Sequence, residues 1–198
     1  MPRLVDHHER KSALAHAVWT LVARNGLEAV SLRSVAAEAG VSMGRVQYYF
    51  ATKDELLLHS LEYAHRQMEA RISARLAEAG GDEREVLVTV LDELLGEHPE
   101  ARDAIRVHAF FAARAADSER MAAVLTDGDD EILALAIRVV AQAKAAGRVA
   151  PDVDPDRDGY ALWTLARGLG NDVALYGTPI DKARQTLTHC VNRVAPAA

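Results

Sequence analysis

Hydrophobic residues recur three and four positions apart along most of the chain, and no segment keeps the two-residue alternation of a strand. Near the N-terminus this spacing is shown by Leu14, Val18 and Leu21, which place one apolar face on a helix from about 8 to 24. The Asn25-Gly26 pair then favours the end of that helix. The pattern predicts an all-α protein of about nine helices without internal repeats.

Capping residues divide the next part of the chain into three further helices. Ser31 and Ser42 each precede a short amphipathic segment, and both can accept a hydrogen bond from a first-turn N–H. The sequence Thr52-Lys53-Asp54-Glu55 has the form of a capping box. These signals predict two short helices and one long helix, over about 31–39, 42–50 and 52–78.

Glycine and proline mark the ends of the remaining helices. Pro99 and Pro155 suit first helical turns, and Gly147 suits a helix end. The acidic sequence PDVDPD at 151–156 lacks the glycine and terminal Glu of an EF-hand loop, so it is interpreted as the start of a helix. The predicted helices cover about 82–95, 99–116, 118–146 (with an interruption at 127–129 as an alternative) and 155–176, and Gly177-Thr178-Pro179 separates these from a last helix that ends near Val194.

The two short helices at 31–50 have the pattern of a helix-turn-helix. Ala36 is small where the two helices must cross closely, and Gly40 permits the positive φ of a tight turn. Val35, Val41 and Val46 are placed to pack the pair together. In such a pair the second helix lies in the DNA major groove.

Composition places the chain among ordinary globular proteins, at 49% hydrophobic and 26% charged residues. No apolar run approaches the roughly 20 residues that span a bilayer. The N-terminal sequence lacks the apolar core of a secretory signal, and Cys190 is the single cysteine, which excludes an internal disulfide. We expect a cytoplasmic protein with no membrane partner.

The net charge of −6 argues against nucleic-acid binding, but the distribution of charge along the chain reverses that argument. Residues 1–53 contain seven Lys and Arg against four Asp and Glu, a formal charge of +3. The other residues contain 16 basic and 25 acidic side chains, a formal charge of −9. A basic N-terminal part on an acidic remainder indicates that the N-terminal part alone meets a polyanion.

The first 60 residues resemble the tetracycline-repressor (TetR) family of bacterial regulators. The resemblance lies in the helix that ends at Asn25-Gly26 and in the motif residues Ser31, Arg33, Val35, Ala36, Ala39-Gly40-Val41-Ser42, Gly44, Tyr49-Phe50, Lys53 and Leu56. It implies a helix-turn-helix domain over 8–68, joined by a long helix to a ligand-binding and dimerisation domain over 69–198. It also implies a homodimeric regulator, usually a repressor, that a small molecule releases from a palindromic DNA operator.

The exposed start of the second short helix supplies the candidate base readers. After the cap at Ser42 come Met43, Gly44, Arg45 and Gln47. Arg45 can pair with guanine and Gln47 with adenine, while Gly44 lets the backbone approach DNA closely. Many family members have a polar or basic residue at Met43 and a tyrosine at Gln47, so the base preferences do not transfer with the docking mode.

Four further residues are candidates for DNA contacts, Arg33 and Tyr49 through the resemblance, and Tyr48 and Lys53 through their places on the second short helix and in the first turn of the long helix. Arg33 reaches a base or phosphate, Tyr49 closes the small core while its hydroxyl reaches a phosphate, and Lys53 holds a phosphate. Tyr48 lies next to the DNA backbone. The alternatives are an ion pair of Arg33 with Glu38 or with an acid of the first helix, a solvated Lys53, and a Met43 that fills a gap in the core.

The acidic remainder contains a second, less specific set of candidates. Aromatic residues with polar neighbours at helical spacing could line a ligand pocket: Arg106, Phe110, Phe111, Arg114, Trp163, Arg167 and Asn171. The same aromatics could simply fill the core. The last two predicted helices carry a row of leucines and small residues that suits a four-helix contact with a second copy.

Catalytic signatures are missing from the sequence. It has no Ser-His-Asp elbow, no P-loop, no G-x-G-x-x-G and no metal spacing among its histidines. We therefore expect neither an enzyme nor a cofactor. A non-specific helical DNA-binding or interaction module remains an alternative to the regulator, as does an enzyme that uses the C-terminal cavity.

Overall fold

The computed structural model describes residues 3–79, 82–115, 119–126 and 129–197. Over these residues it consists of α-helices, one 3₁₀ helix and connecting loops, with no strand, which confirms the all-α prediction. The chain forms two compact units. The N-terminal unit contains Met1–Gln67 and Arg106–Leu125, and the C-terminal unit contains Met68–Ile105 and Thr126–Ala198.

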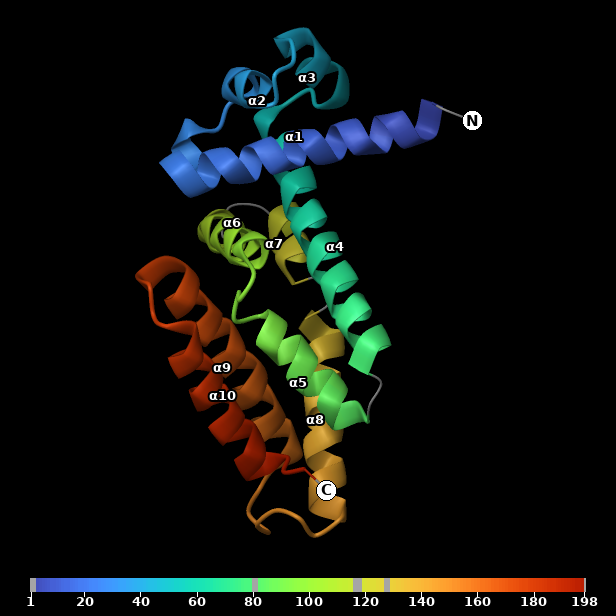
Figure 1. The fold of residues 1–198 in the computed structure, drawn as a ribbon, viewed down its shortest axis with the longest axis vertical. Coiled ribbons are helices and arrows are strands. Elements are labelled where there is room, and N and C mark those ends of the chain that lie inside the picture. Colours follow the sequence, from blue (N-terminus) through green and yellow to red (C-terminus); the bar gives the residue numbers. More distant parts are fainter. Residues whose placement is uncertain (1–2, 80–81, 116–118, 127–128, 198) are drawn as a thin grey trace. The chain divides into compact units, whose positions relative to one another are not determined.

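The N-terminal unit is built on three helices that contact one another (Figure 1). α2 packs against both α1 and α3. The beginning of α4 and the end of α6 belong to the same unit, because both of these helices run across the division between the units. The bounds are α1 Arg3–Asn25, α2 Leu32–Glu38, α3 Met43–Tyr49, α4 Lys53–Ala79, α6 Pro99–Ala115 and α7 Glu119–Leu125.

The predicted caps of α2, α3 and α4 are present, with one change of partner. The hydroxyl oxygens of Ser31 and Ser42 accept hydrogen bonds from the N–H groups of Ser34 and Arg45. At α4 the Thr52 hydroxyl accepts from the Glu55 N–H at 3.1 Å. The Glu55 carboxylate, however, accepts from the N–H of Ala51 at 2.8 Å, one residue before the position that a capping box uses.

A buried aromatic joins α1 to α4 within the N-terminal unit. The Trp19 indole donates a hydrogen bond to the Ser60 carbonyl at 3.2 Å, and its ring lies 5.1 Å from that of Tyr63. Around it, α1 buries a row of residues at the predicted helical spacing: Leu14, Ala15, Val18, Trp19 and Val22. The indole satisfies its single donor while it fills the core.

The C-terminal unit is a bundle in which α9 contacts α5, α8 and α10 (Figure 1). Asp154 caps the start of α9, and Gly177 ends it with a φ of 73°. Leu87, Leu91, Leu162 and Leu187 meet in the core of the bundle. The bounds are α5 Glu83–Glu93, α8 Asp129–Ala145, α9 Pro155–Tyr176 and α10 Ile180–Val194.

A close crossing in the C-terminal unit lies between α9 and the end of α5. A Cβ added to Gly170 would come within 2.0 Å of the Leu94 carbonyl oxygen. Any side chain at this position would therefore force the two backbones apart. A Cβ on Gly168, two residues earlier, would meet nothing within 4 Å.

Two predicted boundaries differ from the observed ones. The first helix begins at Arg3 rather than near His8, since the apolar face that marked its start does not reach the polar first turns. The segment 118–146 forms two helices, α7 and α8, which raises the described α-helices to ten. The predicted interruption at 127–129 accounts for this, although residues 127–128 lie outside the described part.

Over the described residues, no helix is both long and apolar enough to cross a membrane. The same residues contain no group of three or more His, Cys, Asp or Glu side chains that could hold a metal ion.

Candidate functional site

The turn between α2 and α3 has the geometry that the sequence predicted. Gly40 has a φ of 64°, a region that side chains disfavour. The Val41 N–H donates to the Ala36 carbonyl at 2.9 Å, which closes the end of α2. Val35 and Val46 are fully buried between the two helices, and Ala36 is buried beside them. Local turn chemistry and a small apolar contact thus fix how α3 is presented.

One side of α3 is buried and the rest of it faces outward. Val46 and Phe50 point into the core of the N-terminal unit. The four predicted base readers, Met43, Gly44, Arg45 and Gln47, are all exposed. Met43 is 41% exposed, which removes the alternative that it fills a gap in this core.

Three polar side chains on the exposed surface of α2 and α3 have no partner among the described residues. Among the described residues, none forms a hydrogen bond or ion pair with the side chain of Arg33, Arg45 or Gln47. A Cβ added to Gly44 would meet nothing within 4 Å, so internal packing does not require glycine there. We name Arg33, Met43, Gly44, Arg45 and Gln47 the recognition surface.

The observed ion pairs exclude a pair between Arg33 and Glu38 in this structure. The carboxylate of Glu38, its suggested partner, is instead 3.3 Å from the guanidinium of Arg24 at the end of α1. Arg33 is exposed. Lys53, by contrast, is half-buried in the first turn of α4 and has a partner within the chain.

The two tyrosines of α3 form a cluster with a residue that the sequence did not single out. Tyr48 is 76% exposed, and Tyr49 is half-buried. Their rings meet edge to face at 5.1 Å, and the His7 ring of α1 lies 4.8 Å from Tyr49 and 6.4 Å from Tyr48. The predicted helix began after His7, so the sequence offered no signal for this contact.

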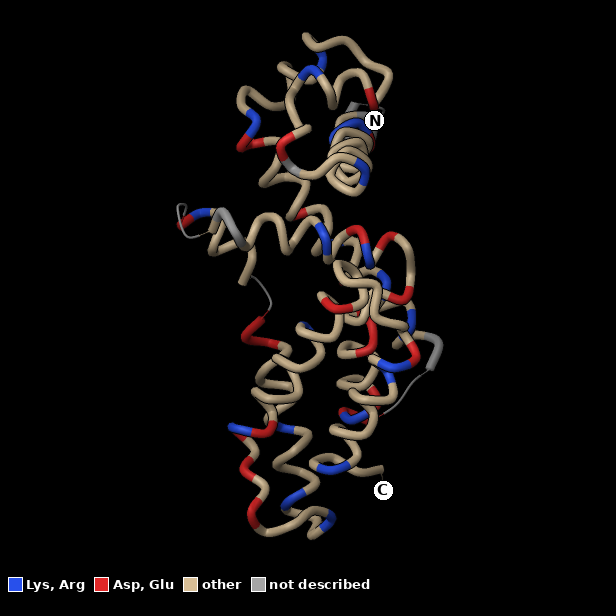
Figure 2. Tube along the Cα trace, turned by 90° about the vertical axis from the view of Figure 1, so that its left-hand side faces the viewer, with Lys and Arg blue, Asp and Glu red and all other residues tan. Residues whose placement is uncertain are grey.

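Charge is less segregated along the fold than the +3 and −9 totals suggest. Figure 2 shows Lys and Arg interspersed with Asp and Glu along the traces of both units. The positive potential expected at the recognition surface therefore depends on Arg33 and Arg45 more than on a broad basic face.

The predicted effector residues of α6 fall within the N-terminal unit. Phe111 is fully buried, as a core residue would be, and Phe110 is 37% exposed. Arg106 is half-buried and has a partner within the chain. The side chain of Arg114 lies outside those that the structure describes.

The predicted effector residues of α9 fall within the C-terminal unit, where the expected shared face is observed. The Arg167 guanidinium lies 4.4 Å from the centre of the Trp163 ring, four residues earlier. Arg167 also approaches Asp129 at the start of α8, at 3.5 Å. Trp163 is buried, and its indole Nε1 has no hydrogen-bond partner among the described residues. Asn171 is half-buried.

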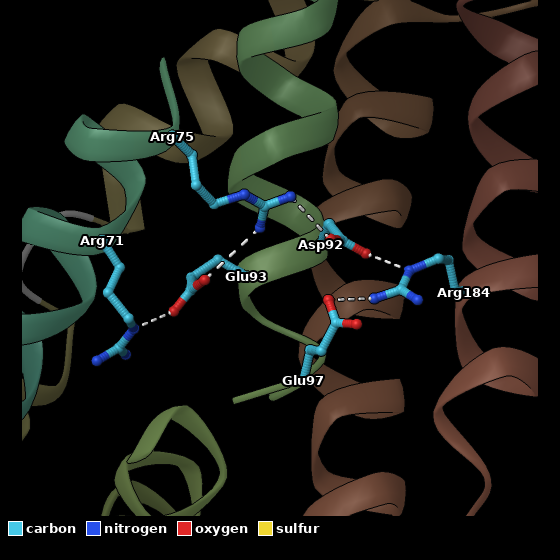
Figure 3. A network of polar contacts seen from close by, with 6 residues as sticks. All are labelled: Arg71, Arg75, Asp92, Glu93, Glu97 and Arg184. Atoms are coloured by element: carbon cyan, nitrogen blue, oxygen red, sulfur yellow. Dashed lines mark hydrogen bonds and ion pairs between the residues drawn. The ribbon is translucent and has the colours of Figure 1, made fainter. Parts of the chain in front are cut away.

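A set of six charged residues in the C-terminal unit was missed by the sequence interpretation (Figure 3). These residues, the ionic network, come from the end of α4, from α5 with the loop that follows it, and from α10: Arg71, Arg75, Asp92, Glu93, Glu97 and Arg184. Asp92 bridges two of the arginines, 3.0 Å from Arg75 and 2.8 Å from Arg184.

Burial is uneven across this ionic network, from the buried Glu93 to the exposed Glu97. Glu93 is buried, and its carboxylate accepts from the Arg71 Nε and lies 3.6 Å from an Arg75 nitrogen. The hydrogen bond that Arg184 donates to Asp92 raises the pKa of the Arg184 guanidinium above its usual range, against the opposing effect of burial. An arginine already charged at every ordinary pH does not become a pH switch through such a change. No periodicity could have shown pairs this far apart in sequence.

A groove of about 880 Å³ runs along the outer side of α9 and α10 in the C-terminal unit. Leu165, Gly168 and Leu169 of α9 line it together with Cys190 and Val194 of α10. The predicted effector residues Trp163, Arg167 and Asn171 are not among its lining. Leu162 contributes both to this lining and to the core of the unit, whereas Leu187 and Val191 belong to the core alone.

Two family models match the chain in sequence order. The model described as "Bacterial regulatory proteins, tetR family" matches residues 14–59, which include α2 and α3. The model described as "BetI-type transcriptional repressor, C-terminal" matches residues 83–196, more than half of the chain.

Similar proteins with established names are transcriptional regulators. The chain is 27% identical over 184 residues to the HTH-type transcriptional regulator PksA of Bacillus subtilis, covering 93% of this chain and 88% of that protein. It is 34% identical over 82 residues to the regulator BetI of Vibrio campbellii, but covers 41% of that protein.

Solved structures agree over nearly the whole length. A transcriptional regulator from Saccharomonospora viridis, solved in complex with choline, superimposes with a TM-score of 0.79 at 25% identity, covering 93% of this chain and 96% of that one. A transcriptional regulator from Rhodococcus sp. Rha1 gives 0.70 at 28% identity, covering 95% and 98%. The chain belongs to the TetR family of bacterial regulatory proteins, with a BetI-type C-terminal domain, and is a helix-turn-helix DNA-binding transcriptional regulator.

Proposed function

We propose that this regulator is a repressor which binds a palindromic operator as a homodimer and leaves it when a small molecule binds the C-terminal part. The domain over 8–68 binds DNA, and the domain over 69–198 dimerises and holds the effector. The observation that carries the proposal is the recognition surface, where a short, capped helix presents exposed polar side chains that no described residue engages.

Each DNA contact follows from the position of its residue. Arg45 and Gln47 lie in the first turns of α3 and read base edges, while Met43 and Gly44 let the helix start approach the groove floor. Ser42 caps the helix end that faces DNA. The Tyr48 and Tyr49 hydroxyls, together with Arg33 and Lys53, contact phosphates or sugars and hold the helix in register.

The groove along α9 and α10 supports dimerisation through the last two helices. Its lining is mainly apolar, with Leu165 and Leu169 beside Gly168, which leaves room for a second backbone. Two copies related by a two-fold axis would bury this groove as a four-helix contact. The dimer places two recognition helices roughly 34–36 Å apart, one turn of DNA, so that a shift of a few ångströms breaks the fit.

Effector release is supported by the BetI-type C-terminal match and by the choline complex of the relative from Saccharomonospora viridis. The candidate effector residues within the C-terminal unit are Trp163, Arg167 and Asn171, whereas the candidates on α6, Arg106, Phe110, Phe111 and Arg114, lie in the N-terminal unit. A small molecule favours release only if it binds the DNA-free conformation more tightly than the DNA-bound one.

Selection from a randomised duplex pool, followed by fluorescence anisotropy on the enriched sequence, tests the repressor. We expect a palindromic site, binding in the nanomolar range, and an affinity that falls steeply with salt as counterions are released. Enrichment of no sequence, with equal affinity for all duplexes, would support the non-specific module instead. Sedimentation at micromolar concentration tests the dimer independently of DNA.

A further inference from the structure

Three buried side-chain nitrogens in the C-terminal unit lack a hydrogen-bond partner among the described residues. They are Nη1 and Nη2 of Arg71 and Nε1 of Trp163. All three atoms can only donate a hydrogen bond. Among the described side chains of this unit, no buried acceptor atom lacks a hydrogen-bond partner. A buried N–H without an acceptor raises the free energy of the fold, because it has lost water without replacing it. This unit is therefore suited to a molecule that brings acceptors.

Arg71 is the strongest of these donors because it is charged and held in place. Its Nε donates to the buried Glu93 carboxylate, which fixes the plane of the guanidinium. Figure 3 shows the two terminal nitrogens pointing away from Glu93 and from the other labelled residues. Two terminal nitrogens in one plane match the two oxygens of a carboxylate.

The other two arginines of the ionic network differ in this respect. Both terminal nitrogens of Arg75 are engaged, with Asp92 at 3.0 Å and Glu93 at 3.6 Å. Arg184 uses its Nε on Asp92 and one terminal nitrogen on Glu97 at 2.7 Å. Arg71 is the member of the network whose terminal nitrogens are both buried and both unpaired.

The buried aromatic of this unit is unsuited to a cationic ligand. A quaternary ammonium binds over aromatic faces, commonly with a carboxylate nearby. In this chain the Trp163 face is covered by the Arg167 guanidinium at 4.4 Å. The nearby carboxylate of Asp129 is 3.5 Å from the same guanidinium. A cation would have to displace an arginine from both groups.

We propose that Arg71 recognises a carboxylate group, and that the effector of this regulator is a small organic acid rather than a quaternary ammonium compound. The proposal rests on the proposed function in assuming that a small molecule controls the chain. The two terminal nitrogens of Arg71 each donate to one carboxylate oxygen of the effector, while Nε stays on Glu93. The negative charge of Glu93 opposes the bound anion, so Glu93 positions Arg71 at some cost in affinity.

Thermal unfolding of the full-length protein tests the ligand class. The probes are straight-chain sodium carboxylates from acetate to decanoate, sodium benzoate, and choline chloride, all against sodium chloride at matched ionic strength. We expect at least one carboxylate to raise the Tm with concentration, as a ligand of the folded state does, and choline to leave it unchanged. Titration calorimetry with the best carboxylate gives its Kd.

Variants of the ionic network separate recognition from folding. Arg71→Met should weaken carboxylate binding by about tenfold or more, which is the loss of a charge-assisted hydrogen-bond pair. Arg75→Met, which removes an arginine of the same network without buried unpaired nitrogens, should leave the Kd within about threefold. Glu93→Gln retains an acceptor for Arg71 but removes the opposing charge, so it should tighten binding.

Opposite effects of Arg71→Met and Glu93→Gln cannot come from a loss of structure common to both. Because Arg71→Met leaves the buried Glu93 with one arginine, the double variant Arg71→Met, Glu93→Gln serves if the single variant fails to fold. It should also have lost carboxylate binding. Retention of binding in either Arg71 variant would overturn the proposal.

Operator binding by the wild type, measured without carboxylate or choline, tests the repressor separately from the carboxylate effector. If the protein binds its selected operator but responds to choline alone, or to no probe, the carboxylate effector is wrong while the DNA-binding function stands. If carboxylates stabilise the wild type through Arg71 and no operator is enriched, the site stands and the repressor is wrong.

Discussion

The two units of this chain use the same side chain in opposite ways. On α2 and α3, Arg33 and Arg45 are exposed, and no described residue pairs with them. In the C-terminal unit, Arg75 and Arg184 are half-buried, and both are paired with Asp92. An exposed, unpaired guanidinium adds little to the fold and is available to a partner, whereas a paired one beside a buried carboxylate holds helices together. Substitutions should therefore affect DNA binding in the first region and stability in the second.

The largest expected effect is on the ionic network. Glu93→Ala leaves Arg71 and Arg75 without their shared buried carboxylate, and breaking such a pair costs about 3–5 kcal/mol. Urea unfolding followed by circular dichroism measures the change. The matched variant on the recognition surface, Arg45→Ala, should stay within about 0.5 kcal/mol of the wild type. Equal destabilisation by both variants would remove the contrast between the regions.

The crossing of α9 and α5 should be the next most sensitive position. Gly170→Ala places a Cβ 2.0 Å from the Leu94 carbonyl oxygen and should destabilise by about 1–3 kcal/mol or more through overpacking. Gly168→Ala, on the same helix, meets nothing within 4 Å in its own chain, so it should not overpack the protomer, and a loss of stability there would arise from the proposed contact with a second copy. Thermal unfolding of the two variants in one buffer compares them, and a tolerated Gly170→Ala would contradict the observed packing.

On the recognition surface the expected losses are in sequence discrimination. Arg45→Ala should cost about 1–3 kcal/mol of discrimination at one base pair of the operator, with no change in unfolding. Lys53→Ala should weaken all duplexes alike and lower the salt slope by about one. Anisotropy on operator and mutated operator, at several salt concentrations, separates the two results.

The tyrosine cluster should give a smaller effect. Tyr49→Phe keeps the ring that packs against His7 and Tyr48 but removes the hydroxyl proposed to reach a phosphate. We expect DNA affinity to fall by roughly 0.5–1.5 kcal/mol, one hydrogen bond, with the Tm unchanged. Unchanged affinity would leave Tyr49 with a packing role alone.

Substitution of Gly44 should have the smallest effect on stability. It also tests directly whether the α3 backbone approaches DNA closely. Because an added Cβ meets nothing in the protein, Gly44→Ala should stabilise α3 by up to about 1 kcal/mol. If the α3 backbone touches DNA at this position, operator binding should nevertheless weaken. A variant that is more stable and binds the operator as well as the wild type would show that Gly44 is not a contact.

Much of the N-terminal unit could be predicted from neighbouring residues. Ser31, Ser42 and Gly40 act on groups within a few positions of themselves, so their effects are visible in the sequence. The contact of Arg167 with Trp163 followed from helical spacing in the same way. The contact of His7 with Tyr48 and Tyr49 could not be predicted, since it joins the first turns of α1 to a helix about forty positions later.

The faces of α9 show where sequence patterns stop being informative. The row of leucines and small residues was interpreted as one surface for a second copy. In the structure, Leu162 lies in the core, Gly170 is pressed against Leu94, and Leu165 and Gly168 line an outer groove. Apolar residues on several sides of a helix do not reveal which side meets which neighbour, because burial depends on where the other helices pass.

The sequence by itself determined the helical content, most of the helix ends, the helix-turn-helix and the family, because each depends on residues a few positions apart. The tertiary structure alone decided which charged side chains form ion pairs with each other and which remain available to bind a partner molecule. Arg71 meets Glu93 across 22 positions and Arg184 meets Asp92 across 92, and nothing in a local pattern encodes either pair. Electrostatic pairing depends on distance and burial in space, so only the packed bundle separates the arginines that hold the fold from those left to meet a partner.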